Sequence, residues 1–261
     1  MQALTLPALG GWQWLAQGYA LFRRQPAMIG LLTMAYWMSV LICNLLPFIG
    51  PLAASLVMPG LSVGVMTACR NVDQGLPVTP ALFFLPLKEH PRPLIWLGGI
   101  YLVCTLAVLA LAAVVDDGAL LQAAAGRVGL DEAGLENGNV ILAAQLILLL
   151  MTPVLMAYWY APALVAWHQL SVSKALFFSF IACLRNWRAF LVYGLGLVAV
   201  GAILPGIVIG LLGSLFPSAA GFITSLLTLP LLMVLAPTLF ASFYISYRDV
   251  FVPREPVSEH A

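Results

Sequence analysis

Six long apolar segments, each free of Asp, Glu, Lys and Arg, dominate the pattern of hydrophobic and polar positions along the chain. A helix needs about 20 apolar residues to cross the ~30 Å hydrocarbon core of a bilayer. None of the segments alternates with period two, as the strands of a membrane barrel do. The pattern therefore predicts an all-α, polytopic membrane bundle of about six transmembrane helices. The expected spans are residues 27–48, 51–69, 94–115, 140–166, 189–212 and 219–245.

Composition agrees with a chain whose surroundings are lipid. Hydrophobic residues make up 62% of the sequence and charged residues only 8%, with a mean hydropathy of +1.02. Soluble domains carry about 25% charged residues. We therefore expect a single transmembrane domain over residues 1–250 and a short cytoplasmic tail over residues 251–261. The four cysteines lie in or beside apolar segments and are interpreted as small buried residues.

The basic residues are distributed unevenly between the two sides of the predicted bundle. Every lysine and arginine except Arg127 lies before the first span, after the last span, or in a connection on that same side. Cytoplasmic connections of membrane proteins are enriched in Lys and Arg, so both termini are expected in the cytoplasm. The connection 116–139, which carries five acids, then lies on the outer side, which is the periplasm if the source is a Gram-negative bacterium. The sequence predicts a multi-pass membrane protein in this orientation.

Two cytoplasmic segments, 9–24 and 171–188, place large apolar residues at helical spacing beside basic ones. Such amphipathic helices lie in the plane of the membrane interface, where their cations attract anionic headgroups. A third segment, 78–93, is broken by prolines and has room for only a turn or two of helix. The predicted contacts with the interface and with lipid headgroups are Arg23, Arg24, Lys174, Arg185, Trp187 and Arg188.

The second helix of each predicted hairpin repeats one signature. Pro59, Pro162 and Pro237 are each followed by a leucine two residues later and by a basic residue eleven or twelve residues later. This pattern predicts three repeats, each an interfacial helix followed by a transmembrane hairpin, packed round a common centre. Glycine pairs at four-residue spacing allow helices to approach closely. The candidates for such packing are Gly60, Gly64, Gly206 and Gly210.

Two stretches carry a family resemblance. They are WLAQGYALFRRQP, which ends at Pro26, and SKALFFSFIACLRNWR, which ends at Arg188. The chain resembles uncharacterised six-helix inner-membrane proteins of proteobacteria over nearly its whole length. It is also similar to the membrane domain fused to some glycerophosphodiester phosphodiesterases. The resemblance implies a fold and a location in the bacterial inner membrane. It carries over no catalytic residue, because the phosphodiesterase chemistry belongs to a separate soluble domain.

Candidate reactive groups are few, and each has a simpler explanation. No span contains the ionisable side chains that mark proton relays and ion pathways. His168 is interpreted as an interfacial anchor, and Lys88, Glu89 and His90 as a solvated charge cluster. Ser171 begins a Ser-x-x-Lys pattern, but no companion motif follows, and a helix N-cap explains it better. We therefore predict no catalytic, cofactor-binding or metal-binding residue.

Three classes of function remain, and the preferred one is a non-enzymatic scaffold, assembly factor or lipid-organising element. The alternative is a channel, a passive carrier or a flippase for an apolar or lipid-like substrate, and a cavity open to one leaflet would favour it. A polar pocket that joined His168, Lys88 and Glu89 would favour an enzyme. Membrane lipids are the expected partners, with a membrane protein as a further candidate and the oligomeric state open. A net charge of +1 gives no support for a nucleic-acid partner.

Overall fold

The computed structural model describes residues 3–46, 49–124 and 138–251, and all regular structure in these ranges is helical. Six helical stretches are long and apolar enough to cross a membrane. They are Pro26–Asn44, Ile49–Asp73, Pro91–Val115, Gly138–His168, Trp187–Leu215 and Pro217–Phe251. The predicted all-α membrane bundle with six spanning helices is therefore confirmed.

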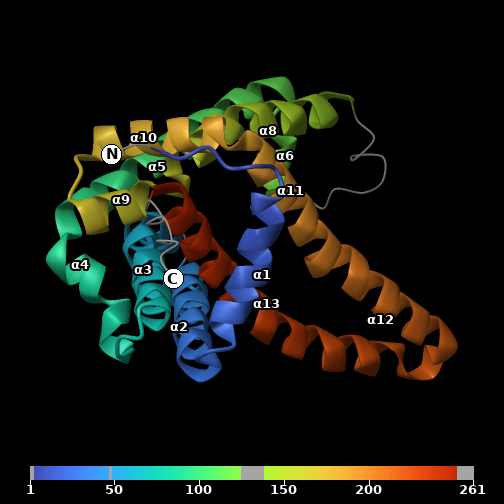
Figure 1. Ribbon diagram of the computed structural model, residues 1–261. Helices are drawn as coiled ribbons and strands as arrows, with labels where there is room; N and C mark the ends of the chain where they lie inside the picture. The colour runs from blue at the N-terminus through green and yellow to red at the C-terminus, as the bar shows by residue number, and fades with distance from the viewer. Residues whose placement is uncertain (1–2, 47–48, 125–137, 252–261) are drawn as a thin grey trace.

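The spanning helices form three hairpins (Figure 1). The first hairpin consists of α2 (Pro26–Asn44) and α3 (Ile49–Asp73). The second consists of α5 (Pro91–Val115), the short α6 (Ala119–Ala124), α8 (Gly138–Trp159) and α9 (Ala161–His168). The third consists of α11 (Trp187–Val198), a π-helical turn (Ala199–Ile203), α12 (Leu204–Leu215), a 3-10 turn (Pro217–Ala219) and α13 (Ala220–Phe251).

A shorter helical segment precedes each hairpin. These segments are α1 (Gly10–Phe22), a 3-10 turn (Pro80–Phe83) followed by α4 (Leu85–Glu89), and α10 (Val172–Arg185). The order of short helix and hairpin is the unit expected from the repeated proline and basic residues. Three helices differ by four or more residues from the expected ends of their spans. Helix α3 continues to Asp73 and α13 to Phe251, whereas α2 ends at Asn44. The tail after residue 251, like most of the connection 116–139, lies outside the described residues.

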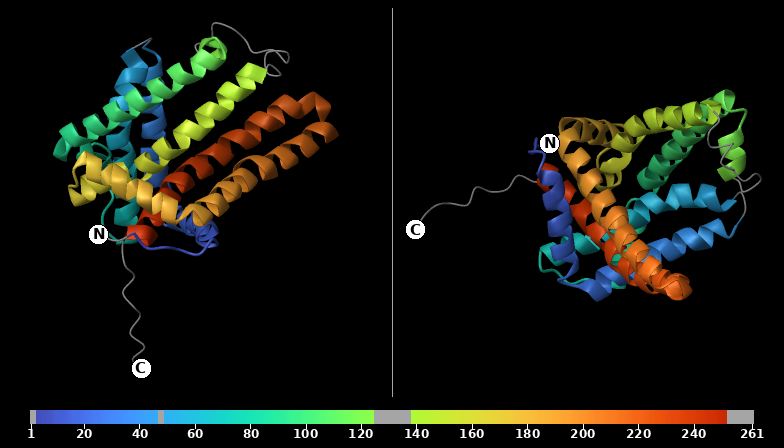
Figure 2. Two further views of the ribbon diagram at one scale, coloured as in Figure 1. Left: turned by 90° about the horizontal axis from the view of Figure 1, so that it is seen from above. Right: turned by 90° about the vertical axis from the view of Figure 1, so that its right-hand side faces the viewer.

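The hairpins diverge from one end of the molecule (Figure 2). We call that end the base: it contains α1, α4, α9 and α10 together with the last turns of α3 and α13. We call the opposite ends of the three hairpins, at Asn44, Val115 and Leu215, the tips. The first and the last described segments of the chain meet at the base, where the Leu4 N–H donates to the Val250 carbonyl at 2.9 Å (Figure 1).

The best-packed part of the protein is the base. Trp14 of α1 is 0% exposed and makes edge contacts with Phe190 and Tyr193 of α11, at centroid distances of 5.3 and 5.8 Å. A side chain at Gly18 would place its Cβ 2.6 Å from the backbone of Ser242 in α13. Helix α1 therefore packs against both α11 and α13, and its Trp12 and Tyr19 side chains stay about half exposed.

Proline explains two irregularities in the spanning helices. Pro162 lacks the N–H that would continue α8, and the helix breaks at Tyr160. The Ser179 hydroxyl of α10 repairs this break: it accepts from the Tyr160 N–H at 2.9 Å and donates to the Met156 carbonyl at 2.8 Å. Pro205 likewise follows the π-helical turn of residues 199–203, where the regular hydrogen-bond ladder is interrupted.

Candidate functional site

A cavity of about 640 Å³ lies between the three hairpins, and it is open rather than enclosed. Every spanning stretch contributes to its wall. The first helices of the hairpins contribute Tyr36, Tyr101, Tyr193 and Leu197. The second helices contribute Ala54, Ser55, Met58, Pro59, Ser62, Leu155, Tyr158, Trp159, Pro162, Leu239, Phe240 and Phe243.

Three of the four tyrosines that line the cavity come from equivalent places in the fold. Tyr36 lies in α2, Tyr101 in α5 and Tyr193 in α11, which are the first helices of the three hairpins. Tyr36 and Tyr101 each follow by ten residues the proline that begins their helix, Pro26 or Pro91. The wall therefore follows the repeated architecture of the chain.

Most hydroxyl groups of the wall are already hydrogen-bonded within the protein. Tyr158 donates to the Leu97 carbonyl at 2.6 Å, and the hydroxyls of Tyr193 and Ser242 lie 2.8 Å apart. In the described part of the chain, the hydroxyls of Tyr36 and Tyr101 have no hydrogen-bond partner. The cavity thus presents an apolar wall with two hydroxyls free to bond a guest.

The wall of the cavity is apolar and aromatic. None of the described residues that line it is Asp, Glu, His, Lys or Arg. Two edge-to-face aromatic contacts stabilise the wall. The ring centroids of Tyr101 and Tyr158 lie 5.0 Å apart, and those of Tyr36 and Phe240 also lie 5.0 Å apart. Large apolar pockets with a few placed polar groups are typical of sites for apolar ligands.

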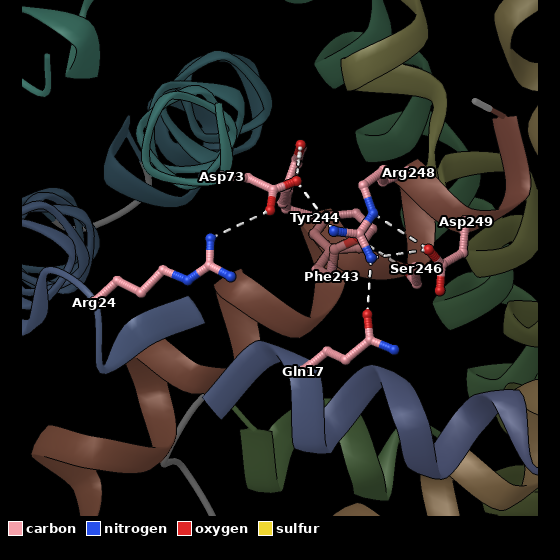
Figure 3. A network of polar contacts seen from close by, with 8 residues as sticks. All are labelled: Gln17, Arg24, Asp73, Phe243, Tyr244, Ser246, Arg248 and Asp249. Carbon is pink, nitrogen blue, oxygen red and sulfur yellow. Dashed lines mark hydrogen bonds and ion pairs between the residues drawn. The ribbon is translucent and has the colours of Figure 1, made fainter. Parts of the chain in front are cut away.

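The polar groups of the protein gather instead at the base, where one network links three helices (Figure 3). Arg248 of α13 contacts Asp73 of α3 at 3.0 Å and donates to the Gln17 side-chain carbonyl of α1 at 2.8 Å. Asp73 also accepts from the Tyr244 hydroxyl at 3.0 Å and lies 3.8 Å from Arg24. The network holds together the ends of helices from the first and third hairpins.

A second pocket, of about 280 Å³, lies at the base beside the ends of α3 and α9 and the start of the second hairpin. We call it the base pocket; its lining is Thr67, Arg70, Asn71, Gln74, Leu76, Leu85, Pro86, Glu89, His90, Ala166 and Trp167. Of the three residues whose meeting would favour an enzyme, only Glu89 lines it. The imidazole of His168 hydrogen-bonds the Tyr247 hydroxyl instead. Within the described ranges there is no group of three His, Cys, Asp or Glu able to hold a metal ion.

All six predicted headgroup contacts are exposed, and all lie on or beside α1 and α10 at the base. The Arg188 guanidinium lies 5.4 Å from the Trp187 ring centroid, and that of Arg23 lies 5.8 Å from the ring of Tyr19. Arg24 is the member that also joins the Asp73 network. The remaining members are Lys174 and Arg185, at the two ends of α10.

The two predicted glycine pairs have different surroundings. A Cβ at Gly60 would overlap the Leu87 side chain, and one at Gly64 would overlap the Phe83 backbone, so this pair admits the segment before α5. A Cβ at Gly206 or Gly210 would meet nothing within 4 Å. That second pair lies on the exposed part of the third hairpin, and its role as a packing site stays a prediction.

Sequence reasoning did not identify the tyrosine-lined cavity or the Asp73 network. A signal existed for the first, because Tyr36 and Tyr101 share a spacing from a helix-starting proline. A signal also existed for the second, because Asp73 and Asp249 follow the ends of the second and sixth expected spans on the side that carries most of the basic residues. Neither signal reveals which residues meet, since that depends on how the hairpins are placed.

The chain is similar in sequence to a known bacterial protein. Over 263 aligned residues, the chain is 35% identical to a probable inner membrane protein of Burkholderia thailandensis, covering 98% of this chain and 96% of the relative. Burkholderia is a proteobacterium, so the resemblance to proteobacterial inner-membrane proteins is confirmed. No family model and no solved structure matches the chain. The likeness to the membrane domain of certain phosphodiesterases stays a prediction.

Proposed function

Since this chain belongs to the same family of multi-pass inner membrane proteins as the Burkholderia protein, we propose that it organises lipids without being an enzyme. In this proposal the cavity between the hairpins takes up acyl chains from the surrounding bilayer. The observation that carries the proposal is the open apolar cavity of about 640 Å³, to which all three hairpins contribute.

The wall of the cavity supports a lipid as the guest. Leu155, Leu239 and Phe243 offer apolar surface, and a lipid tail in the membrane meets such a surface without leaving an apolar medium. The free hydroxyls of Tyr36 and Tyr101 are suited to donate to the ester oxygens that follow the tails in a glycerolipid. The described residues of this wall include no charged side chain that could bind an ion, so the wall suits an ion less well than a lipid.

The positive-inside rule supports an orientation with the base in the cytoplasm. All the described lysines and arginines belong to the base or to the segments that join it, and the exposed cations of α1 and α10 suit the anionic inner leaflet. Both termini are then cytoplasmic and the connection 116–139 is periplasmic. A green fluorescent protein fused to the C-terminus is expected to fluoresce, since that protein matures in the cytoplasm. An alkaline phosphatase fused within residues 125–137 is expected to be active.

Mass spectrometry of the full chain extracted in native-membrane nanodiscs tests the lipid proposal. The wild type is expected to retain a defined number of lipids after the bulk bilayer is removed. Leu155→Trp places a bulky ring in the cavity wall, and we expect it to reduce the retained lipid severalfold. Leu149→Trp is the matched control, because Leu149 is an exposed leucine of the same helix that does not line the cavity.

Equal lipid retention by Leu155→Trp and Leu149→Trp would contradict the proposal. So would a wild type that retains no lipid. A protein recovered in fixed ratio with the chain, in place of lipid, would favour the assembly role instead.

A passive carrier or flippase is the second candidate, and the open mouth of the cavity favours it. A lipid that enters such a cavity between diverging hairpins has a path along their inner faces. Proteoliposomes with a fluorescent headgroup-labelled lipid distinguish the two roles, because dithionite quenches only the outer leaflet. Complete quenching that depends on the wild type and is slowed by Leu155→Trp would favour the flippase. Quenching that stops at half would favour a lipid-holding role.

A further inference from the structure

The base pocket contains opposite charges that the protein itself does not pair. Arg70 lines it from the end of α3, and Glu89 lines it from the end of α4. Both residues are described, and the structure shows no ion pair between them or with any other described residue. No residue lines both this pocket and the large cavity, so the base pocket is a separate site.

The Arg70 guanidinium is held in place but is not neutralised. Its central carbon lies 5.3 Å from the centroid of the Trp167 ring, within the range of a cation–π contact. Trp167 is fixed in turn because its indole N–H donates to the Thr67 hydroxyl at 3.2 Å. Asp73, three residues after Arg70, is already engaged by Arg248 and Arg24. A guanidinium fixed in this way is preorganised to bind phosphate oxygens.

The remaining polar groups of the pocket complete a site for a ligand with both charges. Glu89 is suited to accept from an ammonium group. The side chains of Gln74 and His90 form no hydrogen bond with the described residues and are available to a ligand. The amide of Asn71 is partly used, since it donates to the Pro77 carbonyl at 3.0 Å. A purely anionic ligand at Arg70 would meet repulsion from Glu89, whereas a zwitterion would satisfy both residues.

We infer that the base pocket binds a phosphodiester that carries a primary ammonium, the headgroup chemistry of phosphatidylethanolamine. The phosphate contacts Arg70 and the ammonium contacts Glu89. This inference rests on the proposed lipid-binding function and gives it a headgroup preference. The apolar surroundings of the pocket favour a lipid over a free solute, because Leu76 in its wall is 47% exposed and Phe84, just before α4, is 52% exposed.

Native mass spectrometry of the full chain in nanodiscs of equal phosphatidylethanolamine and phosphatidylglycerol tests the inference. We expect the wild type to retain phosphatidylethanolamine in preference. Arg70→Gln is expected to lower that retention about tenfold, because it removes the charge-assisted contact with the phosphate. Glu89→Gln is expected to shift the preference toward phosphatidylglycerol, because it removes the repulsion of an anion. Arg92→Gln is the control: Arg92 is an exposed arginine close in sequence that does not line the pocket.

Different outcomes separate the headgroup inference from the function on which it rests. If the wild type retains lipid but Arg70→Gln and Glu89→Gln leave the headgroup ratio unchanged, the base pocket is not the headgroup site and the cavity proposal survives. If the wild type retains no lipid, both fail. Competition with soluble glycerophosphoethanolamine distinguishes the source of the headgroup. Displacement of the lipid by equal concentrations of this solute would overturn the lipid as the ligand.

Discussion

The base and the tips of the molecule differ in the kind of contact that their side chains make. At the base, hydroxyl groups join different helices, as Ser179 joins α10 to the break between α8 and α9. At the tip of the third hairpin, hydroxyls bond only the preceding turn of their own helix, as Ser214 bonds the Leu211 carbonyl. Helix α12 has no buried residue among those described, whereas Trp14, Tyr160 and Leu164 at the base are fully buried.

The difference follows from the solvent. In lipid, an apolar side chain gains little by leaving the bilayer, so apolarity alone does not bring helices together. Close backbone approach and polar contacts do, and in the described chain these are concentrated at the base. The tips are free to diverge, and their divergence leaves the cavity between the hairpins. The base is therefore expected to govern stability, and the region between the hairpins to govern binding.

The largest expected effect comes from filling a close contact between two helices at the base. Gly18→Val places side-chain atoms against the backbone of Ser242, which has no room to move aside. We expect a loss of about 3 kcal/mol in the free energy of unfolding, or failure to fold, as overpacking against backbone implies. Gly210→Val is the matched change near a tip, where nothing lies within 4 Å, and it is expected to be nearly neutral. Thermal unfolding in detergent measures both, and equal destabilisation would contradict the distinction between base and tips.

The next effect comes from removing the acid that joins α1, α3 and α13. Asp73→Asn leaves Arg248 with Asp249 as its remaining counter-ion in the described chain and weakens the contact with Tyr244. The side chains of Asp73 and Arg248 are 18% and 26% exposed, so water compensates part of the loss. We expect a cost of about 2 kcal/mol in unfolding free energy. Asp117→Asn, at an exposed acid near a tip, is expected to have little effect on the thermal midpoint, and a similar shift for both variants would contradict the role of the network.

The sequence predicted the helices well because length and apolarity suffice to identify a spanning helix. All six expected spans overlap those of the structure, and short helices precede the hairpins as the repeat suggested. The ends were harder to predict, since charged residues continue a helix when they find partners. Asp73 and Arg248 extend α3 and α13 in this way. Pairing of residues far apart in the chain cannot be read from the periodicity of either helix.

The repeated basic residues also show that a sequence pattern does not predict which side chains meet. Arg70, Lys174 and Arg248 occupy equivalent positions in the proline signature, and a repeat alone predicts equal roles. In the structure Arg248 pairs with Asp73, Arg70 stacks on Trp167, and Lys174 is exposed. The cavity could not be predicted from the sequence either, because apolar helix faces that pack together, face lipid or line a cavity have the same composition. To predict the cavity, one must know the angle between the hairpins, and contacts at the base determine that angle.

A smaller effect is expected from the hydroxyl that repairs the helix break at the base. Ser179→Ala removes the acceptor of the Tyr160 N–H and the donor to the Met156 carbonyl. Ser179 is fully buried, so water cannot replace it, and we expect a loss of about 1–2 kcal/mol. Ser214→Ala removes a hydroxyl that bonds only its own helix and is expected to change the thermal midpoint less. A neutral Ser179→Ala would indicate that the break at Tyr160 is held by packing alone.

The smallest expected effect is a difference in the chemical reactivity of two cysteine thiols at neutral pH. One cysteine lies at the base and the other lies near a tip. Cys183 of α10 is 3% exposed, and burial raises the pKa of its thiol to about 12, so it stays protonated and unreactive. Its neutral form contributes fully to stability below the ordinary pKa of 9.0, and that contribution is lost as the pH rises toward 12. We therefore expect maleimide at pH 7.5 to leave Cys183 unmodified in the folded protein and to modify it after unfolding. Single-cysteine variants that retain Cys183 or the partly exposed Cys43, close to the tip of the first hairpin, provide the comparison. Faster labelling of Cys183 than of Cys43 in the folded state would contradict a base that is packed more tightly than the tips.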